Sequence, residues 1–118
     1  MKYWYVVFLV IICTSCVQET FKRTVTFSVD MSHESNVLSV GVRGDFDPLA
    51  WDEDFLLTDK DNDSIYTGTI TFDTPFDFVS IKFVKNNSVF ELNGKDNRKV
   101  YFDKLNESTK LEVIFNEE

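Results

Sequence analysis

The chain shows no arrangement of side chains that indicates acid–base or nucleophilic catalysis. Its single histidine, His33, lies in the turn-like sequence Ser32-His33-Glu34-Ser35, and no nucleophile motif accompanies it. Carboxylate pairs such as Asp52 and Asp54 could serve as the acid and base of a glycosidase. A chain with 20 Asp and Glu residues contains many such pairs, so this spacing carries no information. The sequence therefore predicts a protein that is not an enzyme and needs no cofactor.

One acidic segment has the carboxylate spacing of a calcium-binding loop. Asp59-Lys60-Asp61-Asn62-Asp63 alternates its acidic residues, but Ser64 replaces the glycine that an EF-hand requires. Ile70 occupies the position of the bidentate glutamate. The segment is not an EF-hand, and we assign no metal ligand to it. A weaker calcium site at Asp59–Asp63 stays open beside the plainer interpretation, a polar hairpin turn.

The amino terminus has the pattern of an export signal. Residues 3–13 are almost purely apolar, follow Lys2, and are about half as long as the ~20 residues of a membrane-spanning helix. Cys13-Thr14-Ser15-Cys16 ends the apolar run. This tetrapeptide resembles the lipobox of bacterial lipoproteins, although Cys13 stands where an aliphatic residue is usual. The resemblance implies cleavage before Cys16 and a diacylglycerol thioether on its thiol; the alternative is an ordinary secretory signal that leaves Cys16 as a free thiol.

Removal of such a signal, residues 1–15, defines the rest of the chain. A tether, residues 16–22, would precede one domain, residues 23–118, and Cys16 would be the remaining cysteine, which excludes an intramolecular disulfide. The remaining chain would then contain 11 basic and 20 acidic residues, which gives a formal charge of −9. Lys and Arg do not cluster, which argues against nucleic acid, and the negative charge opposes binding to anionic lipid. We expect a lipid-anchored protein of the bacterial cell envelope, at the outer membrane or the cell surface.

The elements that would position functional side chains are predicted to be β-strands. Apolar and polar residues alternate at a period of two in five segments, a pattern typical of half-buried strands. The segments are Val25 to Met31, Leu38 to Val42, Tyr66 to Phe72, Val79 to Phe83 and Leu111 to Phe115. Turn-forming residues separate them. The pattern predicts an all-β fold, a single antiparallel β-sandwich of seven or eight strands that is immunoglobulin-like. Parallel pairing is not expected without crossover helices.

Short motifs in a fixed order connect the chain to a known family. They are Val25-Thr26-Phe27-Ser28-Val29-Asp30-Met31, Val40-Gly41-Val42-Arg43-Gly44-Asp45-Phe46, Trp51, Leu56-Leu57-Thr58-Asp59, Ile65-Tyr66-Thr67, Ile81-Lys82-Phe83-Val84-Lys85, Val89-Phe90-Glu91-Leu92 and Asn97-Arg98. The series covers nearly all of residues 23–116 and resembles the starch-binding domains of carbohydrate-binding module family 20 and their glycogen-binding relatives. The resemblance implies a non-catalytic β-sandwich that binds α-1,4-linked glucan on an exposed surface.

The resemblance also implies a sugar site of two aromatic residues, a lysine and an asparagine. Trp51 matches the first aromatic residue, Lys82 matches the lysine and Asn97 matches the asparagine. Phe90 stands where the second tryptophan usually lies, and Glu91 matches the acidic residue that follows it. The loop before Asn97 is longer than in the family. These two departures leave a second hypothesis open, a structural or protein-interaction sandwich of the cell envelope that binds no sugar.

The chemistry of these residue types suits a carbohydrate. A glucose ring has apolar C–H faces and a rim of hydroxyl groups, so it needs flat aromatic area and fixed hydrogen-bonding groups. Trp51 offers the area, and Lys82 and Asn97 offer donors and an acceptor. Strand alternation turns Lys82 outward if Ile81 and Phe83 face the core. Each residue also has a simpler interpretation. In it, Trp51 is a half-buried cap on the edge of the sandwich, Phe90 belongs to the core, and Lys82 is a solvated charge. The Asn97-Arg98 pair then forms part of a turn in which Arg98 pairs with a carboxylate.

Overall fold

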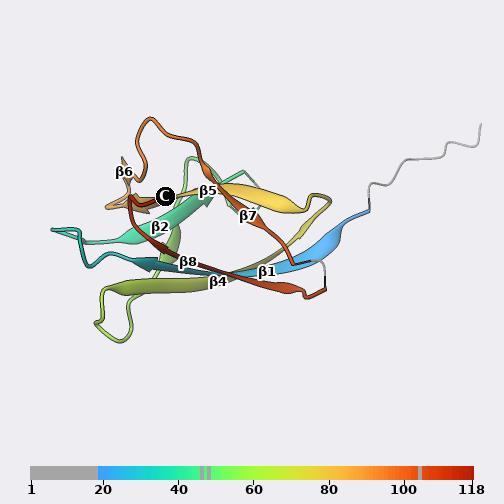
Figure 1. Ribbon diagram of the computed structural model, residues 1–118, viewed down its shortest axis with the longest axis horizontal. Coiled ribbons are helices and arrows are strands. Elements are labelled where there is room, and N and C mark those ends of the chain that lie inside the picture. Colours follow the sequence, from blue (N-terminus) through green and yellow to red (C-terminus); the bar gives the residue numbers. More distant parts are fainter. Residues whose placement is uncertain (1–18, 46, 48, 104) are drawn as a thin grey trace, which may run out of the picture.

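The computed structural model describes residues 19–45, 47, 49–103 and 105–118 (Figure 1). The strands are β1 (Phe21–Asp30), β2 (Val40–Gly44), β3 (Phe55–Leu57), β4 (Ile65–Thr74), β5 (Phe78–Lys85), β6 (Val89–Phe90), β7 (Arg98–Tyr101) and β8 (Ser108–Ile114). Within these residues no helix is long and apolar enough to cross a membrane. The predicted signal, residues 1–15, and the predicted lipidation site, Cys16, lie outside the described part of the chain.

The strands form two sheets that pack face to face. One sheet has the order β4-β1-β8, and the other has the order β3-β2-β5-β6 with β7 also paired to β5. Figure 1 shows the two layers, with β1, β4 and β8 in one and β2, β5 and β7 in the other. The predicted all-β sandwich of seven or eight strands is confirmed.

Alternation along the strands builds the core between the layers. Val25, Phe27 and Val29 of β1 are fully buried, and so are Ile81 and Phe83 of β5. The rings of Phe27 and Phe83 meet edge to face across the two sheets, with centroids 6.0 Å apart. Burial of side chains of this kind contributes roughly 1.5–3 kcal/mol each. The period-two pattern therefore identified the inward faces of these strands.

Three details of the predicted strands differ. Strands β1 and β8 pair in parallel, with Val25 opposite Thr109 and Asp30 opposite Ile114, so the expectation of wholly antiparallel pairing was wrong for this pair. Between β1 and β8 the chain passes through the other sheet. The strands of that sheet provide the crossover connection that a helix usually provides. Strand β1 begins at Phe21, two residues before the predicted start of the domain. Strand β2 begins at Val40, so Leu38 lies before it, and the Leu38 side chain is 87% exposed, where the pattern predicted a half-buried strand.

The acidic segment Asp59–Asp63 forms the turn between β3 and β4. The Asp59 carboxylate accepts the backbone N–H groups of Asp63 (3.1 Å) and Ser64 (3.0 Å). Asn62 and Ser64 have positive φ angles of 53° and 68°, which a tight reversal needs. In the described part of the chain no group of three His, Cys, Asp or Glu side chains could hold a metal ion. The geometry agrees with the hairpin interpretation of this segment.

Candidate functional site

The outer face of the five-stranded sheet brings together most of the predicted site residues. Lys82 lies in β5 between buried Ile81 and Phe83, so alternation turns its side chain away from the core. Phe90 pairs with Val84, which shares the outer face with Lys82. Asn97 is exposed and directly precedes β7, whose first residue, Arg98, pairs with Ile81 of β5.

Arg43 of β2 joins the tryptophan segment to this face. It pairs with Lys82 across the β2–β5 ladder. Its Nη1 donates to the Trp51 carbonyl oxygen (3.1 Å), and its guanidinium carbon lies 5.1 Å from the centroid of the Phe90 ring. Its Nη2 donates to the backbone oxygen (3.2 Å) and to Oδ1 (2.9 Å) of Asn87. Arg43 thus contacts both aromatic residues of the predicted site.

Sequence reasoning missed Arg43, although a signal for it existed. Val40 and Val42 were predicted to face inward, so alternation leaves Arg43 on the outer face of the same strand. Its partner Asp54 accepts from Nε at 2.6 Å, and both side chains are largely buried, at 11% and 5% exposure. Such a charge-assisted bond holds its partners firmly. Nothing in the sequence indicated which of the many carboxylates Arg43 would select.

Glycine at position 41 allows Asp54 to pack onto the sheet. A Cβ atom on Gly41 would lie 2.6 Å from the Asp54 Cβ, closer than real contacts allow. Asp54 Oδ2 is buried there without a hydrogen-bond partner among the described residues. Asp54 is therefore a buried anchor for Arg43, whereas its neighbour Asp52 lies exposed. The two carboxylates lie in different environments.

Lys82 positions the loop that precedes β7. Its Nζ donates to the backbone oxygens of Leu92 (3.1 Å) and Lys95 (3.0 Å). Two of its three N–H donors are thus directed to the loop backbone. The loop turns at Gly94, whose φ of +79° suits glycine. The longer loop before Asn97 is consequently tied to the sheet at Lys82.

Glu91 does not belong to the exposed site, and its assignment to a sugar contact was wrong. Its side chain is completely buried. Oε2 accepts from the Phe83 backbone N–H (2.9 Å) and from Arg98 Nε (2.9 Å), while Oε1 accepts from Arg98 Nη2 (2.8 Å). Because Phe90 faces outward in β6, the next residue must face inward. The alternative role considered for Arg98, pairing with a carboxylate, is the one found.

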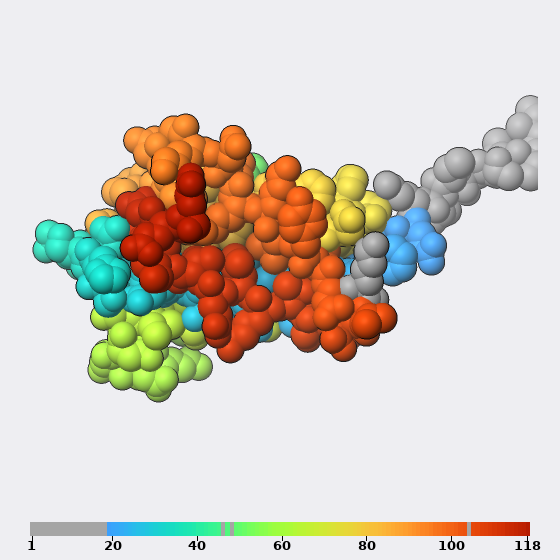
Figure 2. Space-filling model, in the orientation of Figure 1, coloured from blue at the N-terminus to red at the C-terminus, as the bar shows by residue number. Residues whose placement is uncertain are grey.

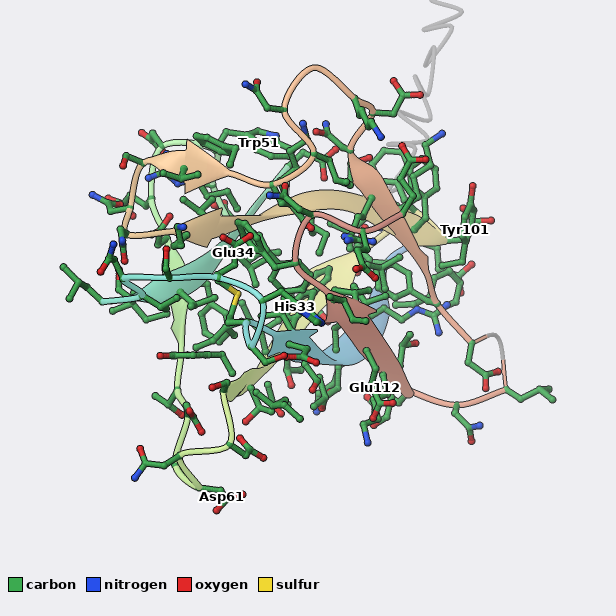
Figure 3. The ribbon with its side chains drawn as sticks, turned by 60° about the vertical axis from the view of Figure 1, so that its left-hand side comes forward. His33, Glu34, Trp51, Asp61, Tyr101 and Glu112 are labelled. Atoms are coloured by element: carbon green, nitrogen blue, oxygen red, sulfur yellow. The ribbon has the colours of Figure 1, made fainter. Side chains whose placement is uncertain are left out.

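The aromatic groups of the site are partly accessible. Trp51 is 38% exposed, and Phe90 is half-buried. Figure 3 shows Trp51 on the same side of the molecule as the orange ribbon that carries β6 and the following loop.

Two surface hollows, of about 460 Å³ and 520 Å³, adjoin these segments. The first is lined by Ser39, Asp52, Glu53, Asp54, Leu56 and Asn87, and the second by Leu92, Gly94, Lys95, Asp96, Asn97, Arg98 and Glu118.

Comparisons with known proteins support the fold. No family model and no curated protein matches the sequence. The structure is similar to that of a glycoside hydrolase family 15 glucoamylase from Hypocrea jecorina, with a TM-score of 0.62 and 19% sequence identity. The match covers 81% of this chain but 17% of the glucoamylase chain. At this identity the likeness shows a shared fold.

Proposed function

We propose that the chain is a lipoprotein of the bacterial cell envelope, anchored at Cys16, whose sandwich binds α-1,4-glucan without cleaving it. The observation that supports this proposal is the position of Arg43, which pairs with Lys82, lies over the Phe90 ring and donates to the Trp51 carbonyl oxygen, while exposed Asn97 directly precedes β7 of the same sheet. The structural likeness to a glucoamylase supports a carbohydrate-related fold. The expected interaction is stacking of a glucose face on Trp51, with hydroxyl groups bound by Asn97 and Lys82.

The first prediction concerns Trp51, which is the one tryptophan of residues 16–118. Binding of maltoheptaose should change its fluorescence, because stacking alters the surroundings of the indole. Trp51→Ala should weaken the affinity for maltoheptaose, measured by calorimetry, about tenfold or more, which corresponds to ~1.4 kcal/mol. Tyr101→Ala is the matched control, since Tyr101 is an exposed aromatic residue of β7 in the same sheet. Unchanged affinity in Trp51→Ala, or no binding by the unaltered chain, would refute the sugar site.

A second candidate function is supported by the same contacts. The Arg43 guanidinium lies on the Phe90 ring, and two Lys82 donors are used by the loop backbone. Both features reduce what the face can offer to a sugar. In this alternative the sandwich has a structural or protein-interaction role, and Trp51 belongs to a protein contact. Recovery of a partner protein from envelope extracts, lost in Trp51→Ala and unaffected by added glucan, would favour it.

A further inference from the structure

One end of the sandwich exposes three large apolar side chains. Phe21 at the start of β1 is 46% exposed, Phe76 in the β4–β5 turn is 50% exposed, and Leu105 in the β7–β8 connection is 93% exposed. Figure 2 shows the start of β1, in blue, and the β4–β5 turn, in yellow, at the same end of the molecule. We call this the tether end, defined by Phe21, Phe76 and Leu105.

Contacts join the segments that carry these three residues. Phe21 and Phe76 line a hollow of about 580 Å³ together with Arg23, Pro75 and Asp77. The β7–β8 connection is joined to β1 by Arg23 Nη1, which donates to the Asp103 backbone oxygen at 3.1 Å, and by the pair of Lys22 and Glu107 at 4.0 Å. The side chains of Phe21, Phe76 and Leu105 thus project from neighbouring segments.

The loop that carries Leu105 is held by the Asp103 carboxylate. Asp103 accepts the Leu105 backbone N–H (2.9 Å) and the Asn106 side-chain amide (3.0 Å). The hydrogen bond from Leu105, followed by that from Asn106, lowers the pKa of Asp103 below its ordinary value. The Asp103 carboxylate therefore holds the backbone of Leu105, whose side chain is 93% exposed.

The chain preceding β1 indicates what meets this surface. The 18 residues before Glu19 include the apolar run 3–13, and Cys16 is five residues before Phe21. Five residues span at most about 18 Å. A lipid on Cys16 would thus keep the start of β1 close to the bilayer surface. The β1–β2 connection, which contains Leu38, lies at the opposite end of the sandwich from the start of β1 (Figure 1).

We infer that the tether end rests in the interfacial layer of the membrane, with Phe21, Phe76 and Leu105 inserted among the lipid headgroups. Aromatic side chains favour this layer. The charges nearby are Lys22, Arg23, Asp77, Asp103 and Glu107, and this mixture of signs, on an acidic chain, suits zwitterionic lipids better than anionic ones. The inference rests on the proposed anchoring at Cys16 and is independent of glucan binding.

The test places a single tryptophan at either end of the full-length chain. Trp4→Phe with Trp51→Phe removes both tryptophans. Phe76→Trp then reports on the tether end, and Leu38→Trp is the matched control at the opposite end. Chains processed in a bacterial host are reconstituted in phosphatidylcholine vesicles, with or without brominated acyl chains, and vesicle association is measured by flotation. We expect brominated lipid to remove most of the emission of the Phe76→Trp reporter and to leave the Leu38→Trp reporter unchanged.

Each other outcome overturns the inference in a recognisable way. Equal quenching of both reporters would mean that the anchored domain has no preferred face. A blue-shifted but unquenched Phe76→Trp reporter would mean that protein covers the surface, either the amino-terminal segment or a second copy. Failure of the chain to float would refute the anchor at Cys16 and the membrane contact with it. Failure of maltoheptaose to bind leaves all of these readouts unaffected.

Discussion

At the scale of single residues, Arg43 connects the candidate site to the rest of the sheet. It bonds to the Trp51 backbone, lies on the Phe90 ring and pairs with buried Asp54. A guanidinium group can do this because its planar fork carries five donors in fixed directions. We therefore regard Arg43 as a positioning residue for the two aromatic side chains.

Replacement of Arg43 should affect both stability and binding. Arg43→Gln leaves the Asp54 carboxylate buried without its partner, and we expect a loss of about 3 kcal/mol in the free energy of unfolding, measured in urea. Arg43→Lys keeps the charge but lacks the planar guanidinium fork. Compared with Arg43→Gln, it should recover part of the stability and a smaller part of the glucan affinity. Lys110→Gln is the control, because the ion pair of Lys110 with Glu112 is about two-thirds exposed. Equal stabilities of Arg43→Gln and Lys110→Gln would disprove this role.

At the scale of elements, the buried pair of Glu91 and Arg98 links four strands. Glu91 follows β6 and accepts the N–H of Phe83 in β5, and Arg98 of β7 also donates to the backbone oxygen of Ile114 in β8 (3.2 Å). The β6–β7 loop is therefore supported from beneath by a charge pair and from the outer face by Lys82. Short strands such as β6, with two residues, have few ladder bonds of their own and depend on such contacts.

Loss of this pair should be costly. Glu91→Ala leaves the Arg98 guanidinium, whose side chain is 12% exposed, without a counter-charge, and we expect the free energy of unfolding to fall by about 3–5 kcal/mol. Glu112→Ala removes an exposed carboxylate of β8 and should change stability by less than about 1 kcal/mol. Urea titration followed by Trp51 fluorescence measures both. A sugar-binding role for Glu91 predicts the reverse, normal stability with weak glucan affinity.

At the scale of the whole molecule, the two sheets are held together by apolar packing between β1 and β5. Phe27 is fully buried and meets Phe83 of the opposite sheet. Phe27→Ala would leave a cavity between the layers, and we expect a cost of about 3–5 kcal/mol in the free energy of unfolding. Leu38→Ala should have little effect, because its side chain is 87% exposed. A thermal melt in which both variants match the unaltered chain would contradict this account of the core.

The connection between β1 and β8 also belongs to this scale. These strands are the first and the last of the sandwich, and they pair in parallel, with β1 in the middle and β8 at the edge of the three-stranded sheet. The chain must therefore pass through both layers before this sheet is complete. Period-two alternation identifies the strands but says nothing about which of them become neighbours. The parallel pairing could therefore not be predicted from the pattern.

The sequence by itself determined the five longer strands, β1, β2, β4, β5 and β8, with their inward faces and the outward direction of Lys82, because alternation is a local property of extended backbone. The shorter strands β3, β6 and β7 show no such alternation and were not identified individually. The motif order placed Trp51, Phe90 and Asn97 as candidates for one surface. Only the tertiary structure decided that Arg43 joins Trp51 to Phe90 and that Glu91 is buried against Arg98. Both depend on side chains from different strands meeting in space, where burial makes one charge pair favourable among many possible ones.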